Sequence, residues 1–114
     1  MTKLSKELVA ASSIPIILSI LTEGEHYGYQ IIQKVRVASG GEVEWADGML
    51  YPILHKLEDK GLVESYWLTS ENGRQRKYYR LKPAGRAALE AEKSNWFIVH
   101  VLLQTLWNPR PNSI

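Results

Sequence analysis

Residues 47–61 read DGMLYPILHKLEDKG, and this stretch decides the fold. Its leucines and its isoleucine recur at spacings of three and four, which predicts an amphipathic helix running to about Lys60. Asp47 is the expected N-cap, and Gly61 is expected to end the helix. The predicted buried face comprises Leu50, Ile53, Leu54 and Leu57, and the predicted outward face comprises Gly48, Tyr51, His55, Lys56 and Asp59.

Two more helices are predicted upstream of this stretch. Residues 28–39 carry apolar residues at helical spacing, and two glycines follow them. The other helix is predicted at 6–22, and it is apolar on nearly all sides, more broadly than a helix exposed along one flank requires. Pro15 lies inside it and permits a helix only with a kink or with a start close to the proline.

A β-hairpin is predicted downstream. Aromatic and β-branched runs at 62–68 (LVESYWL) and 76–81 (RKYYRL) flank the pair Asn72-Gly73, which marks the turn. Tyr78 and Tyr79 are adjacent, so they must point to opposite faces of their strand. Tyr79 is the one expected in the core.

A last helix is predicted to begin at Pro83, because proline suits the first turn. The segment starts polar and rich in alanine and then reads WFIVHVLLQTLW at 96–107, where nine of twelve residues are apolar. The order of elements is therefore helix, helix, helix, hairpin, helix. This order predicts a mainly α fold with a two-stranded β wing, namely a winged helix-turn-helix followed by a C-terminal helix.

The charge is unevenly distributed along the chain. The net charge is only +2, but six of the fourteen basic residues lie between Arg74 and Arg86, with no acidic residue among them. The rest of the chain holds eight basic and twelve acidic residues. This pattern indicates a local site for a polyanion, although charge alone fits a solvated basic hairpin equally well. The position of the cluster on a predicted wing favours nucleic acid.

Several function classes are disfavoured by the sequence. The chain has no cysteine, which excludes a disulfide framework, a thiolate zinc site and a cysteine nucleophile. His26, His55 and His100 lie in three different segments, and no catalytic or phosphate-binding motif stands out, so we expect neither an enzyme nor a metal or cofactor site. The apolar stretches at 8–21 and 96–107 are shorter than the roughly 18–20 residues that cross a bilayer, and no signal peptide is recognised. A cytoplasmic protein is expected.

Three blocks of the sequence resemble one family. Residues 47–63, DGMLYPILHKLEDKGLV, resemble the recognition-helix block of PadR-type transcriptional regulators. HYGYQI at 26–31 resembles the start of that family's second helix, and RQRKYYRL at 74–81 resembles its wing, with Gly85 where its fourth helix begins. The likeness covers about residues 8–90. The short C-terminal part resembles the subfamily that has a single C-terminal helix.

Three positions depart from the family pattern. Lys82 stands where the family usually has threonine, and because lysine cannot cap a helix with an oxygen, the last helix is expected to start less stably by about 1 kcal/mol. Met49 stands where small residues or threonine are commoner in the family. His55 stands where lysine or arginine is commoner. These two departures bear on which operator sequence is bound.

The resemblance and the fold together imply binding to double-stranded DNA. The expected DNA-binding residues are Tyr27, Gly28 and Tyr29 at the start of the second helix, Gly48, Met49, Tyr51, His55 and Lys56 on the third, and Arg74, Arg76 and Lys77 on the wing. An alternative stays open for each of two residues. Tyr51 could instead cover the edge of the hydrophobic core, and His55 could instead be a solvated helix residue. Arg80 and Lys82 are expected at ordinary exposed positions.

A homodimer is also expected, because one small subunit cannot bury both apolar terminal helices. The expected interface comprises Leu8, Ile14, Ile17, Leu18, Trp96, Val99, Leu102, Leu103 and Leu106. The chain is therefore divided into a winged helix-turn-helix domain at 1–82, a dimerisation helix at 83–108 and a tail at 109–114. The helix at 6–22 within the first domain is expected to join the dimer interface. A two-fold dimer would bind a pseudo-palindromic operator. The alternative is that both helices belong to the core of one subunit.

A small-molecule effector is implied by the resemblance alone. PadR-like proteins are typically repressors released by small aromatic or drug-like molecules, and Trp96, Val99 and Leu103 are the expected lining of such a site. Trp96 serving only as interface packing is the alternative. A rival function is a winged-helix module that binds proteins and has no effector.

Overall fold

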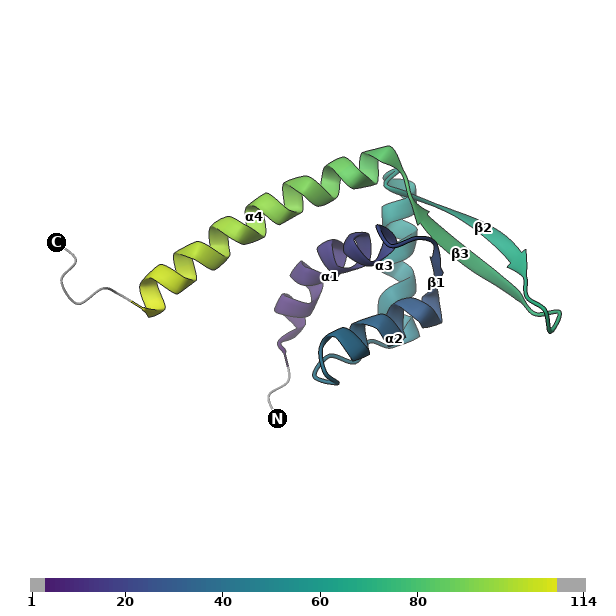
Figure 1. Cartoon of the computed structure of the whole chain (residues 1–114), viewed down its shortest axis with the longest axis horizontal. Coiled ribbons are helices and arrows are strands. Elements are labelled where there is room, and N and C mark those ends of the chain that lie inside the picture. The colour runs from purple at the N-terminus through teal and green to yellow at the C-terminus, as the bar shows by residue number, and fades with distance from the viewer. Residues whose placement is uncertain (1–3, 109–114) are drawn as a thin grey trace.

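The computed structural model describes residues 4–108. Its elements are α1 (Lys6–Leu21), β1 (His26–Tyr27), α2 (Gly28–Ala38), α3 (Asp47–Asp59), β2 (Val63–Thr69), β3 (Gln75–Leu81) and α4 (Pro83–Trp107). Helices α1 to α3 form a cluster, the β2–β3 hairpin (the wing) projects from one side, and α4 extends from the other (Figure 1). The winged helix-turn-helix fold is confirmed. The expected tail at 109–114 lies outside the described residues.

Helix α1 spans Lys6–Leu21 with Pro15 inside it, rather than starting near the proline. Ser5 caps the helix, because its hydroxyl accepts a hydrogen bond from the Leu8 backbone N–H at 3.1 Å. The Ser19 hydroxyl donates to the Pro15 carbonyl at 2.7 Å. A start at the proline is therefore wrong, and the good cap at Ser5 explains why the helix begins earlier.

The buried face of α1 corrects part of the expected dimer interface. Ile17 and Leu18 are fully buried within the subunit, in one cluster with Ile31 and Leu50. Side chains that are already enclosed by their own subunit cannot be buried again by a second one. Their assignment to an interface between subunits is wrong.

The predicted third helix is α3, and its start differs by one residue. Ala46 is the N-cap, with extended backbone, and Asp47 is the first helical residue. Asp47 is thus not the N-cap, although its carboxylate in the first turn still suits the positive end of the helix dipole. The expected apolar face is fully buried at Leu50, Leu54 and Leu57, and Ile53 is half-buried. Gly61 follows with a φ of +74°, as expected for a residue that ends a helix.

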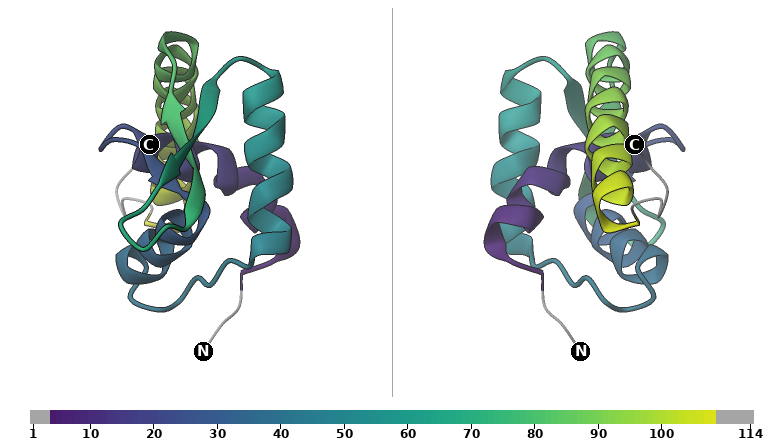
Figure 2. Two further views of the ribbon diagram at one scale, coloured as in Figure 1. Left: turned by 90° about the vertical axis from the view of Figure 1, so that its right-hand side faces the viewer. Right: turned by 90° about the vertical axis from the view of Figure 1, so that its left-hand side faces the viewer.

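The sheet has one more strand than predicted. Its order is β1-β3-β2, all antiparallel, and His26 pairs with Tyr79 and Tyr27 with Tyr78. The wing is therefore tied to the start of α2 as well as to its own turn. Tyr79 is fully buried, as expected, and Tyr78 lies on the other face. Viewed from the wing side, α3 and the hairpin stand side by side (Figure 2).

Helix α4 starts against the body and then leaves it. Lys82 is the N-cap without a side-chain hydrogen bond, as its departure from threonine predicted. A Cβ on Gly85 would collide with the Leu62 carbonyl and lie 2.7 Å from Leu81 Cδ1, so only glycine fits this crossing. Beyond the half-buried Trp96 the helix is exposed except at the half-buried Leu103, and Leu106 retains 65% of its accessible surface. The alternative that this segment is core of its own subunit is wrong.

Candidate nucleic-acid interface

A cleft of about 720 Å³ lies between the wing, α3 and the start of α2. The cleft is lined by Tyr27, Tyr29, Tyr51, His55, Trp67, Arg74, Gln75, Arg76, Lys77 and Tyr79. Seven of the eleven predicted DNA-binding residues are in this set. The three chain segments that carry them are therefore brought to one surface by the fold.

The four other predicted residues do not line the cleft. Gly48 and Lys56 are exposed on α3 beside it, and Met49 packs partly against the core. Gly28 is buried, and a Cβ there would collide with the Tyr51 hydroxyl and lie 2.7 Å from Tyr51 Cζ. Gly28 therefore lies beneath Tyr51 and does not line the cleft. Its function is to let the Tyr51 side chain lie across the start of α2.

Tyr51 covers the edge of the core and also lines the cleft. Its ring covers Gly28 at the edge of the core, yet 36% of its surface remains exposed at the cleft. Burial, followed by the nearby Asp47 carboxylate, raises the pKa of Tyr51 above its ordinary value. The phenol is therefore protonated at neutral pH and can donate a hydrogen bond.

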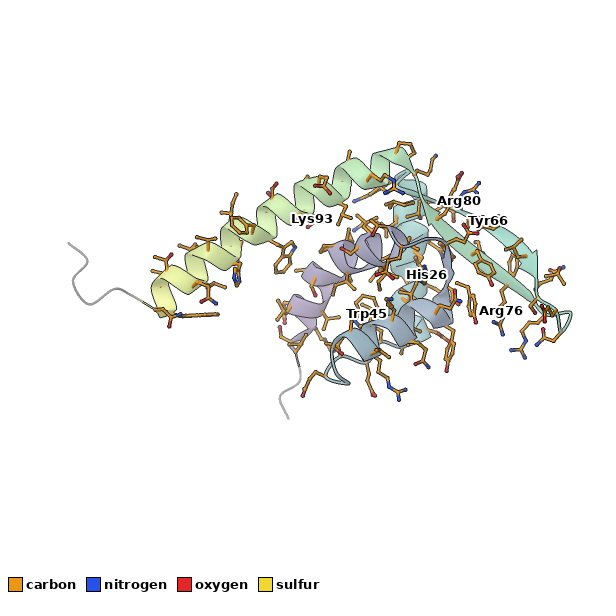
Figure 3. The ribbon with its side chains drawn as sticks, in the orientation of Figure 1. His26, Trp45, Tyr66, Arg76, Arg80 and Lys93 are labelled. Carbon is orange, nitrogen blue, oxygen red and sulfur yellow. The ribbon has the colours of Figure 1, made fainter. Side chains whose placement is uncertain are left out.

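The three wing cations that line the cleft have different surroundings. Arg74 is exposed, next to a turn in which Gly73 has a φ of +81°. Lys77 Nζ lies 4.0 Å from Glu58 Oε1, so its charge is partly offset within the subunit. Arg76 donates a hydrogen bond to the Tyr27 hydroxyl, and its Cζ lies 4.4 Å from the centroid of that ring. Figure 3 shows Arg76 between the hairpin and the start of α2.

Besides Tyr79, which was predicted only as core, two cleft residues were missed by sequence reasoning. Trp67 is 62% exposed and pairs with Lys77 across the hairpin, and Gln75 lies one step nearer the turn on the same face. The alternation of side chains along a strand could have revealed them, because residues an even number of positions apart lie on the same face. Trp67 therefore shares a face with the buried Val63, and Gln75 shares a face with the buried Tyr79. Residues on this face of the hairpin that lie closer to the turn than the buried core must therefore face the cleft.

The floor of the cleft carries a buried phenol. Tyr79 is fully enclosed, and its hydroxyl has no hydrogen-bond partner within the part of the chain that the structure describes. Burial, with smaller effects from Glu58 and Tyr51, raises the pKa of Tyr79 to about 12. The floor is thus uncharged, while the cationic side chains stand at the walls.

A model of the PadR-like family of transcriptional regulators matches residues 17–91, which is more than half of the chain. The chain belongs to the PadR-like family. This PadR-like regulator is 50% identical over 46 residues to transcriptional regulator Rv3488 of Mycobacterium tuberculosis, an overlap of 40% of this chain and 42% of that protein. The match thus spans less than half the length of that relative.

Solved structures resemble the PadR-like regulator over nearly its whole length. A transcriptional regulator from Clostridium thermocellum has a TM-score of 0.80 and 27% identity, covering 88% of this chain and 97% of that one. A PadR-like transcriptional regulator from Bacillus cereus has a TM-score of 0.79 and 27% identity, covering 92% and 100%. Like other members of its family, the protein is a DNA-binding transcriptional regulator and not an enzyme.

Residues 4–108 of this PadR-like regulator hold neither a metal-binding cluster nor a membrane-spanning helix. No group of three or more histidine, aspartate or glutamate side chains in that range is arranged to hold a metal ion. In the same range, no helix combines the length and the apolar character that a bilayer crossing requires.

Proposed function

We propose that the cleft is the surface that binds duplex DNA, with α3 in the major groove and the wing along the backbone. In this arrangement Tyr51, His55 and Lys56 reach base edges or phosphates, and Arg74, Arg76 and Lys77 contact the backbone or the minor groove. Gly48 lets the start of α3 approach a phosphate, and Tyr29 lies at the rim. The observation that carries the proposal is that one cleft gathers cations and hydrogen-bonding aromatics from three separate segments.

We propose further that the protein is a homodimer with α4 at its interface. Support comes from the exposed apolar residues in the second half of α4, which no part of the described subunit covers. The proposed interface residues are Leu8, Ile14, Trp96, Val99, Leu102, Leu103 and Leu106. Helix α4 (83–108 with its C-cap) is then the dimerisation helix of a winged domain at 1–82. Two clefts about 34–36 Å apart would bind a pseudo-palindromic operator.

A repressor released by a small aromatic or drug-like ligand is the regulatory mode we propose. An apolar cavity of about 500 Å³ lies between α1 and α2, with Trp96 of α4 in its wall. This cavity supports Trp96 as a ligand contact, whereas Val99 and Leu103 do not line it within one subunit. A ligand in this cavity can release the protein from DNA only if it binds more tightly to a dimer conformation with one distance between the two clefts than to a conformation with another. Otherwise it does not shift the equilibrium between the conformations. A cytoplasmic location stays a prediction.

The test of the DNA surface is duplex affinity measured by fluorescence anisotropy at several salt concentrations. We expect the triple variant R74A/R76A/K77A to bind all duplexes more weakly and to lower the slope of log affinity against log salt by about 2 to 3. Lys93→Ala on α4 is the matched control, because Lys93 is exposed and far from the wing (Figure 3). An unchanged affinity of the triple variant would remove the wing from the DNA surface.

The rival function is a winged-helix module that binds proteins and has no effector. Membership of a DNA-binding family argues against it. The same salt series separates the two, because binding through phosphates weakens steeply with added salt. Duplex binding that ignores salt would favour the rival.

A further inference from the structure

Tyr27 is joined to the wing by four interactions. Its backbone pairs with Tyr78 of β3, and its ring meets the Tyr78 ring edge-on, with 5.2 Å between centroids. Its hydroxyl accepts the hydrogen bond from Arg76 Nη1, while the guanidinium lies over its ring. A tyrosine at the start of α2 therefore contacts a cation 49 residues later in the chain.

The ring of Tyr27 is itself held by a row of stacked groups on the sheet face away from Tyr79. Tyr66 stacks on Tyr78 with 6.1 Å between centroids, and Arg80 Cζ lies 4.9 Å from the centroid of Tyr66. Arg80 is fixed in turn by Glu64, because its Nε lies 2.8 Å from a carboxylate oxygen. Figure 3 shows Tyr66 and Arg80 on the hairpin nearer to α4 than Arg76. Tyr27 is thus anchored on one side and contacts Arg76 on the other.

Arg76 keeps most of its donors for another partner. A guanidinium has five N–H donors, and the Tyr27 hydroxyl takes one of them. Arg76 lines the cleft, so the remaining donors are at the proposed DNA surface. A long side chain that is already held in one pose loses less conformational entropy when it binds than one that samples many rotamers.

We propose that Tyr27 is a positioning residue that holds Arg76 in the pose that contacts a DNA phosphate, and that it makes no DNA contact of its own. The inference rests on the proposed DNA surface, and it replaces the phosphate contact that the sequence predicted for Tyr27. The observation that carries it is that Arg76 both donates to the Tyr27 hydroxyl and lies over the Tyr27 ring.

A double-mutant cycle on duplex affinity tests the positioning role. Tyr27→Phe keeps the ring and removes the hydroxyl, and we expect it to weaken binding about three- to tenfold in the wild-type background. In the Arg76→Ala background the same change is expected to have no effect, because there is no guanidinium left to hold. Equal losses in both backgrounds would mean that Tyr27 contacts DNA by itself and would overturn the proposal.

Arg74→Ala provides the matched control background. Arg74 is a cation of the same cleft, but Tyr27 has no contact with it among the described interactions, so Tyr27→Phe should cost the same factor there as in the wild type. Arg76→Lys is a second variant that keeps the charge and loses the planar fork, and it should also abolish the effect of Tyr27→Phe. An effect that persists in this lysine background overturns the proposal.

Thermal melting of each variant separates positioning from a structural role. A merely structural Tyr27 would lower the melting temperature and leave the two affinity losses additive, which overturns the proposal. If Arg76→Ala leaves affinity unchanged while His55→Ala or Lys56→Ala lowers it, only the positioning role is wrong. If the wild type binds no duplex, the DNA surface and the positioning role are both wrong.

Discussion

Replacing Gly28 by alanine tests whether the shape of the cleft depends on the packing of Tyr51. The added Cβ would lie 2.7 Å from Tyr51 Cζ and closer still to its hydroxyl. Ordinary contact between carbon atoms is about 3.5–4.0 Å, so the tip of Tyr51 must retreat by about 1 Å. The backbone of α2 can stay in place, because the obstacle is the end of a partly exposed side chain.

The cost of Gly28→Ala should therefore fall on DNA binding and not on stability. Because Gly28 has no positive φ, alanine should stabilise the protein by about 0.4–1 kcal/mol through the lower entropy of the unfolded chain, which offsets a strain of about 1 kcal/mol from the added methyl group. In the proposed DNA surface, a displaced Tyr51 would lose one hydrogen bond worth about 1 kcal/mol, so duplex affinity should fall about fivefold. Fluorescence anisotropy measures the affinity, and calorimetric melting measures the stability.

Tyr51→Ala supplies the matched background, because it removes the side chain that the methyl group would strike. In that background Gly28→Ala should have no further effect on affinity. Wild-type affinity for Gly28→Ala alone would refute the reasoning, and so would a loss that persists when Tyr51 is absent. Either result would show that Tyr51 does not contribute to the DNA surface through its position over Gly28.

Three further predictions concern the subunit. Leu106→Glu should shift the protein from dimer to monomer in sedimentation, whereas Ser94→Glu, at an exposed position on the same helix, should leave the dimer intact; a dimer in both would contradict the interface. Gly85→Ala should lower the free energy of unfolding by about 2–3 kcal/mol in chemical denaturation, because its obstacle is the backbone carbonyl of Leu62; wild-type stability would refute that crossing. Tyr79→Phe should match or exceed the wild type at neutral pH, because the hydroxyl is buried without a partner. The folded pKa of Tyr79 is raised from 10.0 to about 12, so the wild type should lose stability as pH rises from 10 to 12, and the phenylalanine variant should lose less in the same melting series.

The sequence was sufficient for the elements whose signals are local. The spacing of leucines in α3, the Asn-Gly turn and the proline at the start of α4 each depend on neighbouring residues, and each gave bounds close to those observed. The parity of Tyr79 predicted its burial for the same reason. Strand β1 could not be found this way, because two residues cannot show an alternating pattern.

Features that depend on tertiary contacts were beyond the sequence. Helix α1 is apolar on nearly all sides, so nothing in its pattern told which side its own subunit covers, and Ile17 and Leu18 were assigned to the wrong environment. The close approach of Tyr51 to Gly28 joins two helices, and the contact of Arg76 with Tyr27 joins a helix start to the wing. The sequence predicted all four of these residues as functional, but only the fold shows which of them contact one another.

The connection between β3 and α4 has a mechanical consequence. Lys82 alone separates Leu81, the last residue of the strand, from Pro83, the first of the helix, and its N–H is bonded to the Leu62 carbonyl at 3.0 Å. Because the connection is one residue long and hydrogen-bonded, we expect α4 and the hairpin to rotate together as one rigid unit. In the proposed dimer, a few degrees of rotation between the two α4 helices would therefore be transmitted to the hairpin tips without any hinge in between.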